Sequence, residues 1–148
     1  MQPIHLTHEA SRPRLNVMGE VIEVLADAGT TGSYEIFEQH GPEGTGSPPH
    51  SHSWDEAYYV LEGELDVQLG ERMVVVRKGD FVHVPGGTPH FFRYRKGGGR
   101  FLSVSSSGRV SAFFADLDRE VPPGPPDLSK VVAIAGRHEL QLAGPPPA

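Results

Sequence analysis

GTGSPPHSHSWDEAYYVLEG, residues 44–63, decides the interpretation of this chain, because it concentrates side chains that can bind a metal. Within it lie His50, His52 and Glu56. Successive side chains of an extended strand point to opposite faces, so positions 50, 52, 56 and 58 share one face if no bulge intervenes. We therefore expect the two imidazoles and the carboxylate to converge from one strand.

A second stretch, GDFVHVPGGTPHFFRY at residues 79–94, supplies a third histidine, His90. An imidazole from a neighbouring strand would complete a donor set for a divalent first-row metal that keeps positions open for water or substrate. The chain has no cysteine, so imidazole and carboxylate are the donors available for such a metal. The sequence predicts a metal site with the ligands His50, His52, Glu56 and His90.

Each histidine also has an ordinary explanation. A single histidine in a strand is more often a surface or hydrogen-bonded residue than a ligand, and a His-x-His pair can arise by chance in a loop. The prolines favour the metal interpretation, because Pro48 and Pro49 precede the pair and Pro85 precedes His90, where side chains have to be aimed accurately. We therefore retain the metal site as the leading hypothesis.

Outside these stretches the sequence is typical of an all-β domain. Its glycines and prolines, 18 and 14 residues, divide it into short segments that alternate polar with apolar positions. About eight strands at this spacing favour a closed barrel or a jelly roll. The expected strands are residues 20–26, 33–39, 56–61, 64–69, 73–77, 81–84, 90–95 and 101–105.

After Gly108 the apolar residues recur at spacings of three and four, which predicts two C-terminal helices over residues 110–117 and 127–142. Asp127 or Ser129 can cap the second helix, and Gly136 favours its early end near His138. We expect these helices to pack on the outer wall of the barrel or across its open end. The predicted apolar stripe of the second helix consists of Leu128, Val131, Val132, Ala135 and Leu142.

Both stretches resemble known motifs. Gly44-x5-His50-x-His52-x3-Glu56-x6-Gly63 is similar to the first cupin motif at every defined position, and Gly79-x5-Pro85-x-Gly87-x2-His90 is similar to the second. Tyr94 stands where the family pattern has asparagine. That asparagine is not a metal ligand in the family, so the departure concerns the lining of the pocket. The chain resembles small single-domain bacterial cupins described as quercetin 2,3-dioxygenase-like, the cupin 2 barrels.

This resemblance implies an all-β fold, a double-stranded β-helix (jelly roll, cupin barrel) with C-terminal helices. Residues 1–148 would form a single cupin domain, with the barrel at about 15–108 and the helical segment at about 109–143. The resemblance also implies a homodimer, for which the apolar segment Glu20–Ala26 is a candidate pairing strand. We expect one divalent transition metal per chain, from the group Fe, Mn, Ni, Co, Cu and Zn.

The residues allow two kinds of metal-dependent enzyme that act on a small oxygen-rich molecule. In a dioxygenase-like enzyme, a substrate with adjacent oxygen donors meets dioxygen at the metal, and Glu56, the candidate catalytic residue, stays a ligand or accepts the substrate proton. In a non-redox isomerase or lyase, the metal acts as a Lewis acid. A non-enzymatic small-molecule or metal-binding module is the third alternative.

Three aromatic residues share the face of the ligands. Tyr58, Phe92 and Tyr94 are candidate substrate-binding residues by this parity, and filling of the core is the alternative explanation. The small-molecule partner that they imply is the one we expect for the chain.

Charge and hydropathy argue against other partners. The formal charge of −6 is carried by scattered residues, which argues against nucleic acid or an acidic membrane surface. No run approaches the roughly 18 apolar residues of a membrane span. Residues 1–17 lack the apolar run of a signal peptide, so we expect a cytoplasmic protein.

Overall fold

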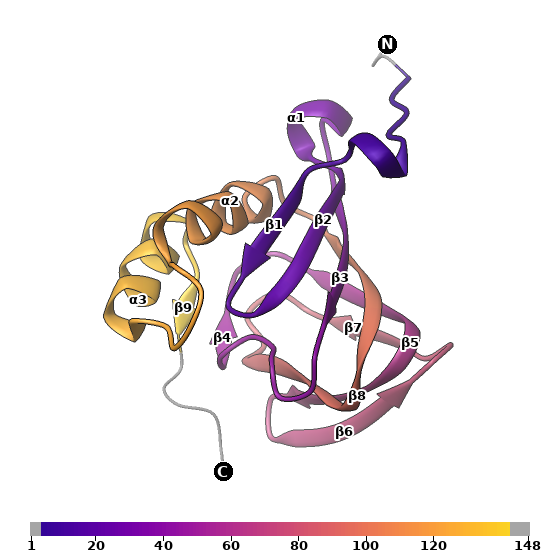
Figure 1. The fold of residues 1–148 in the computed structure, drawn as a ribbon, viewed down its shortest axis with the longest axis vertical. Coiled ribbons are helices and arrows are strands. Elements are labelled where there is room, and N and C mark those ends of the chain that lie inside the picture. Colours follow the sequence, from indigo (N-terminus) through magenta and orange to yellow (C-terminus); the bar gives the residue numbers. More distant parts are fainter. Residues whose placement is uncertain (1–3, 143–148) are drawn as a thin grey trace.

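The computed structural model describes residues 4–142, whose strands curl into a barrel with two helices packed beside it (Figure 1). The expected fold class, an all-β double-stranded β-helix with C-terminal helices, is confirmed. The strands are β1 (Arg14–Val17), β2 (Glu20–Ala26), β3 (Glu35–Gly41), β4 (His50–Ser51), β5 (Glu56–Leu69), β6 (Arg72–Arg77), β7 (Phe81–Val84), β8 (His90–Ser105) and β9 (Gln141–Leu142). The helices are the 3-10 turn Glu9–Ser11, α1 (Ala28–Thr31), α2 (Val110–Glu120) and α3 (Leu128–Arg137).

Two long antiparallel strands, β5 and β8, organise the barrel. Along one path the sheet order is β1-β2-β3-β8-β4-β9, and β5 pairs with β6, β7 and β8. The first half of β5 pairs with the second half of β8, Glu56 opposite Ser105, and the second half of β5 pairs with the first half of β8, Leu69 opposite His90. Glu56 and His90 therefore lie at opposite ends of this ladder, and the bends in the two strands bring those ends together.

The sequence divided each of these strands into two, and that expectation was wrong. The predicted strands 56–61 and 64–69 are one strand, and so are 90–95 and 101–105. The glycines between them bend the strands without ending them: the register shifts between Val60 and Glu62 and again between Gly63 and Leu65, and the pairing continues beyond. Gly63 has a φ of +74°, and a Cβ there would lie 2.3 Å from the Gly98 carbonyl oxygen, so this close approach of two bent strands requires glycine.

Two clusters of buried apolar side chains hold the fold together. The first fills the barrel with aromatic rings, for example Phe92 against Phe101 at 5.0 Å and Tyr58 against Phe101 at 5.1 Å, both edge to face. The second lies between β1, β2 and β3 and the helices, where Phe37 meets Phe114 at 5.1 Å. The C-terminal helices therefore complete a core of their own.

The second C-terminal helix differs from its predicted stripe. Val131, Ile134 and Ala135 are buried, whereas Leu128 and Val132 are 56% and 53% exposed. A helix of ten residues buries one narrow face, and that face passes through Ile134 and not through Val132.

Leu142 lies beyond the helix in β9, since α3 ends at Arg137, close to the predicted end at His138. Asp127 is the N-cap and accepts hydrogen bonds from the N–H groups of Ser129 and Lys130.

Strand β9 adds the C-terminal part of the chain to the edge of the sheet, beside β4. Leu142 lies opposite His50, and Gln141 lies opposite Ser51. On its other side β4 pairs with β8, with His50 opposite His90. The two-residue strand β4 is thus held from both sides, although it is too short to be stable by itself.

The proposed dimerisation strand is not a free edge, which corrects the expectation for Glu20–Ala26. β2 pairs with β1 over Glu20–Glu23 on one side and with β3 on the other, so most of its hydrogen-bonding groups are already used inside the sheet. No helix within residues 4–142 is long and apolar enough to cross a membrane.

Candidate metal centre

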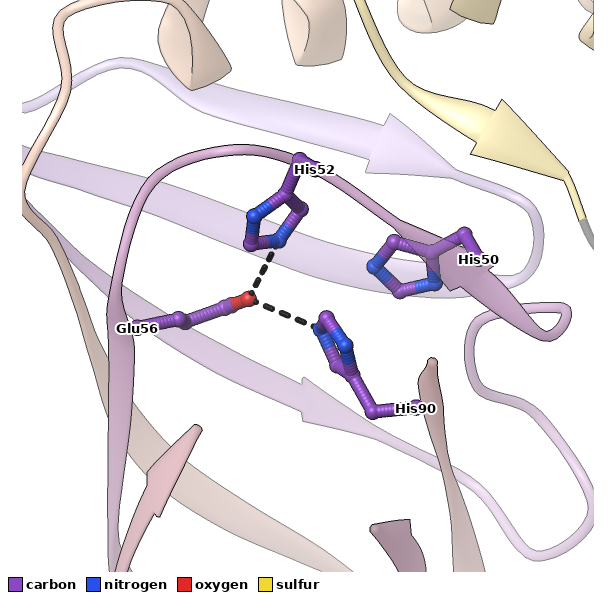
Figure 2. Close-up of side chains that lie close together, drawn as sticks. All are labelled: His50, His52, Glu56 and His90. Atoms are coloured by element: carbon purple, nitrogen blue, oxygen red, sulfur yellow. Dashed lines mark hydrogen bonds and ion pairs between the residues drawn. The ribbon is translucent and has the colours of Figure 1, made fainter. Parts of the chain in front are cut away.

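The four predicted ligands meet at one end of the barrel. One candidate ligand atom from each of His50, His52, Glu56 and His90 lies within 4.8 Å of the others. Figure 2 shows the imidazoles of His52 and His90 directed at the Glu56 carboxylate, with His50 beside them. The Oε2 atom of Glu56 lies 3.0 Å from His52 Nε2 and 3.1 Å from His90 Nε2. Side chains from two separate motifs are therefore neighbours in this cluster.

The route to this convergence differs from the predicted one. His50 belongs to β4, His52 lies in the loop after it, and Glu56 begins β5, so the three side chains do not come from one strand. The chain turns between positions 52 and 56, and this turn, not the alternation of a single strand, brings the imidazoles over the carboxylate.

A repeated local device orients His50 and His90. Each histidine follows a proline, and its Nδ1 contacts the carbonyl oxygen two residues earlier, Pro48 at 2.8 Å and Thr88 at 2.7 Å. A carbonyl oxygen only accepts hydrogen bonds, so Nδ1–H is the donor and Nε2 is left with its lone pair facing the site. The proline fixes the backbone between the ring and the carbonyl.

His52 reaches the same state by a different contact. Its Nδ1–H donates to the Trp54 carbonyl oxygen at 3.0 Å, and its ring stacks on the Trp54 indole with centroids 4.4 Å apart and planes at 4°. His52 is 6% exposed, so the stacked indole shields it from water. All three imidazoles therefore present Nε2 to the centre.

The loop between His52 and Glu56 is locked onto the second motif. The N–H of Gly87 donates to the His52 carbonyl oxygen at 2.7 Å, and the N–H of Gly86 donates to Asp55 Oδ1 at 2.9 Å. A Cβ at Gly86 would lie 2.2 Å from the Ser53 carbonyl oxygen. The two motifs thus support one another, and glycine is needed where the backbones touch.

The charges in the cluster suit a cation. Burial alone would raise the pKa of Glu56, but hydrogen bonds with His52 and His90 hold it well below its ordinary range. Burial, together with the neighbouring His90, lowers the pKa of His50 to about 4. Burial lowers the pKa of His90, and the contacts with Glu56 more than offset this and raise it. At neutral pH Glu56 is therefore an ionised carboxylate and His50 a neutral imidazole, the forms that ligate metals.

The donor set itself passes a test of fit. With hydrogens on all three Nδ1 atoms, neutral rings would set the Nε2 lone pairs of His52 and His90 against the carboxylate lone pairs of Glu56. Contacts of 3.0 and 3.1 Å between acceptors require a positive charge, supplied either by protons on the rings or by a metal ion. The residues present fit a divalent metal.

A small cavity of about 60 Å³ adjoins the cluster. His50 and Glu56 form part of its wall, and Tyr58 and Phe92 lie next to them as predicted from parity. Tyr94 is not part of the wall: it is 1% exposed, and its hydroxyl donates to Glu20 Oε2 at 3.0 Å. The remaining wall is formed by Val17, Met18, Glu20, Gln39, Gly46, Ser47, Pro48, Phe114 and Leu117.

Helix α2 contributes to the wall of this cavity. Its residues Phe114 and Leu117 line the same space as Met18 and the candidate ligands His50 and Glu56. The C-terminal segment therefore packs on the barrel wall and at the same time covers the site, which unites the two positions considered for it.

Comparisons with known proteins agree with this architecture. Residues 37–105 match the cupin domain family. The matched segment of the chain is a cupin domain. A curated relative, the quercetin 2,3-dioxygenase of Bacillus subtilis (strain 168), is 33% identical over 99 residues, which are 65% of this cupin and 29% of the relative. This cupin thus spans less than a third of the length of that enzyme.

Three solved structures superpose on this one. An RmlC-like cupin from Shewanella frigidimarina has a TM-score of 0.66 at 20% identity, covering 75% of this cupin and 97% of that chain. The polyketide cyclase RemF from Streptomyces resistomycificus has a TM-score of 0.61 at 26% identity, covering 70% of this cupin and 79% of that chain. KdgF from Halomonas sp. has a TM-score of 0.67 at 19% identity, covering 74% and 99%.

Two polar residues of this cupin's cavity were missed by the sequence analysis. Glu20 and Gln39 line the cavity, and both are buried, at 5% and 3% exposure. They lie outside both motifs, so motif spacing gives no sign of them. Strand parity could have found Glu20, because it shares the inward face of β2 with Ile22 and Val24, where a carboxyl group is out of place.

Proposed function

We propose that this cupin binds one divalent transition metal per chain through His50, His52, Glu56 and His90, and that it is a metal-dependent enzyme acting on a small oxygen-rich molecule. The convergence of three Nε2 atoms and one carboxylate oxygen beside a small cavity, whose wall includes His50 and Glu56, supports this proposal. Fe, Mn, Ni, Co, Cu and Zn all accept imidazole and carboxylate ligands, so the donor set leaves the metal open among these six.

The dioxygenase-like reaction is the leading candidate, supported by the 33% identity to a quercetin 2,3-dioxygenase over the cupin region. A bound metal would supply Lewis acidity and, for a redox-active ion, one-electron chemistry. The protein would bind an enol or hydroxyketone in the cavity and exclude water from it. Glu56, ionised and beside the substrate, is the group we assign to accept the substrate proton at one of its carboxylate oxygens.

A non-redox reaction is the second candidate, favoured by the 26% identity to a polyketide cyclase. The same Glu56 carboxylate would move a proton between two positions of a carbonyl compound, as an isomerase, lyase or cyclase requires. No oxygen would be consumed. A binding module without catalysis would show ligand affinity with neither oxygen uptake nor product.

The cavity limits the size of the substrate. Its volume of about 60 Å³ is well below the roughly 300–1,000 Å³ of pockets that hold drug-sized ligands. We propose that Tyr58 and Phe92 contact the substrate directly and that Tyr94 acts on it through Glu20. A flavonoid would require α2 to move away with Phe114 and Leu117, whereas a molecule of a few heavy atoms would fit without such movement.

We further propose that the chain is a single domain and forms a homodimer. Since β2 is paired on both edges, a sheet face is the better candidate for self-association. Tyr59 and Phe81, opposite one another on β5 and β7, are 46% and 65% exposed, and Val104 on β8 is 38% exposed. Light scattering on the purified protein measures the mass directly, and a monomer would contradict the proposal.

Elemental analysis combined with an oxygen electrode tests the proposed activity. Protein purified from its native host should contain about one transition metal per chain. A panel of enolic, hydroxyketone and flavonoid compounds is then added while oxygen is recorded and products are analysed. Oxygen uptake supports the dioxygenase, and product without uptake supports the non-redox enzyme. Protein that holds no stoichiometric metal after purification without chelators would contradict both.

A further inference from the structure

Glu20 is a buried carboxyl group in the wall of the cavity, outside the candidate metal cluster. It begins β2, is 5% exposed, and within the described residues forms no ion pair with Lys, Arg or His. Its two oxygens accept one hydrogen bond each, Oε1 from the Gln39 side-chain amide at 3.2 Å and Oε2 from the Tyr94 hydroxyl at 3.0 Å. Both donors are neutral, so no positive charge compensates a carboxylate here.

The cavity joins Glu20 to the candidate metal centre. Glu20, Gln39, His50, Glu56 and Tyr58 all line the same space of about 60 Å³. The Glu20 and Glu56 side chains are close enough to influence one another's charge, and both act on Tyr58, whose pKa is raised by burial and then by these two carboxylates. A ligand in so small a space can contact Glu20 and Glu56 at the same time.

The surroundings keep Glu20 protonated. Burial raises its pKa to about 8, the Tyr94 hydrogen bond opposes this, and the Glu56 charge adds to it. Tyr94 is itself neutral, because burial and the neighbouring Glu20 raise its pKa. A protonated carboxyl is a hydrogen-bond donor as well as an acceptor. Since both oxygens already accept hydrogen bonds from the barrel wall, its own O–H is free to act on the cavity.

From this geometry we infer that Glu20, supported by Gln39 and Tyr94, is a second polar anchor of the cavity that donates a hydrogen bond to a substrate oxygen not held by the metal cluster. The ligand class is a small molecule with two adjacent oxygens for the metal and a third hydroxyl or carbonyl oxygen. The inference rests on the proposed function and adds a substrate-contacting residue that lies outside both cupin motifs.

Glu20 also suits a proton transfer that complements Glu56. When Glu56 removes a proton from the substrate, negative charge develops on a substrate oxygen. The O–H bond of Glu20 then breaks and a bond to that oxygen forms, which leaves a carboxylate already bound by Gln39 and Tyr94. One carboxyl group gains a proton and the other loses one, so the charge of the cavity is unchanged and no oxidant is consumed.

A carboxyl group with a purely structural role would also form hydrogen bonds with Gln39 and Tyr94. The test must therefore measure how a ligand binds in the cavity. The probes are acetohydroxamic acid, which binds divalent metals through two adjacent oxygens, and glycolohydroxamic acid, which adds one hydroxyl. The ratio of their affinities for metal-loaded protein cancels any loss of stability common to both. The variants are Glu20→Ala for the ratio, Glu20→Gln for infrared spectroscopy, and Glu23→Gln as the matched control.

Glu23 is a suitable control because it lies three residues away on β2 and is equally buried, at 4% exposure. It faces the other side of the sheet, where Arg12 pairs with it at 3.3 Å. Its substitution changes a buried carboxyl without touching the cavity.

We expect the wild type and Glu23→Gln to prefer glycolohydroxamic acid about tenfold, the effect of one hydrogen bond of about 1.4 kcal/mol, and Glu20→Ala to lose this preference. The infrared C=O band of a protonated carboxyl should be present at pH 7, shift when glycolohydroxamic acid binds, and be missing in Glu20→Gln. All variants should keep their metal.

Three results would overturn the inference. If Glu20→Ala keeps the preference, or if the band is present but insensitive to the ligand, Glu20 is a structural residue and the proposed metal enzyme is unaffected. If Glu20→Gln retains the band, the protonated carboxyl is another residue. If the wild type contains no metal and binds neither hydroxamate, the proposed function fails first, and metal content identifies that case.

Discussion

Two carboxyl groups in one cavity take opposite charge states. Glu56 sits between imidazoles, which hold its pKa far down in spite of burial, and Glu20 sits between an amide and a phenol, where burial raises the pKa to about 8. Burial raises the pKa of both carboxyl groups, so burial alone does not decide their charge. The neighbours decide it: groups that can carry positive charge ionise a carboxyl, and neutral donors leave it protonated.

The largest expected effect is the loss of metal binding at the candidate metal centre. His50→Ala combined with His90→Ala should abolish stoichiometric metal binding, because two of four donors are removed, and the barrel should remain folded since its core lies elsewhere. Elemental analysis and circular dichroism measure the two outcomes. His83→Ala is the control, an exposed histidine on β7. One metal per chain in the double variant would disprove the ligand set.

Acid should release the metal from the same centre without a mutation. Imidazole ligates a metal when neutral, and protons compete with the metal at His90 earlier than at an ordinary histidine, because its pKa is raised. We expect bound metal to be lost as pH falls below roughly 5 to 6, with a lower melting temperature. Metal content and thermal unfolding across this range check the prediction. A melting temperature that responds to neither acid nor chelator would contradict a stabilising metal.

The contribution of Glu20 to stability should change with pH in the opposite direction. Its folded pKa, about 8, lies above the ordinary value of 4.5, so its contribution to stability is complete below pH 4.5 and is lost as pH rises through about 8. The loss amounts to several kcal/mol, at about 1.4 kcal/mol per unit of pKa. Urea unfolding of metal-free protein should show this slope in the wild type and a weaker one in Glu20→Gln. Equal slopes would contradict the protonated carboxyl.

The smallest effect concerns the loop that joins the two motifs. Asp55→Ala removes the acceptor for the Gly86 N–H at 2.9 Å, at a cost of about 1 kcal/mol in stability. Since the loop also positions His52, metal affinity should fall roughly tenfold, as for other groups that orient ligands. Competition with a metallochromic indicator measures this affinity. Asp80→Ala, which removes the turn contact to the Arg77 N–H at 2.8 Å, is a control away from the loop.

The metal-ligand cluster could be predicted from sequence, because its residues lie in two short stretches of the chain and the prolines and glycines of both motifs can be recognised by their spacing. The spacing of His50, His52, Glu56 and His90 is enough to identify the cluster. The predicted route was wrong, since the turn at residues 52–55 is not coded by alternation. The merging of strands at Gly63 also escaped, because a glycine that ends a strand and one that bends it look alike in sequence.

The group formed by Glu20, Gln39 and Tyr94 could not be predicted in the same way. Glu20, Gln39 and Tyr94 come from β2, β3 and β8, and only the pairing of these strands brings them together. Such contacts between distant segments leave no local pattern. The same holds for β9, whose Leu142 lies beside His50 although the two residues are far apart in the chain. Sequence patterns thus described the elements well and the partners of the short strands poorly.

The cavity wall contributed by Phe114 and Leu117 comes from a different part of the chain than the candidate ligands. Substitutions in α2 can therefore reshape the space for a substrate while the donor atoms stay in place. In evolution, or in a mutant library restricted to residues 110–120, substrate selectivity can change while the metal ligands stay the same.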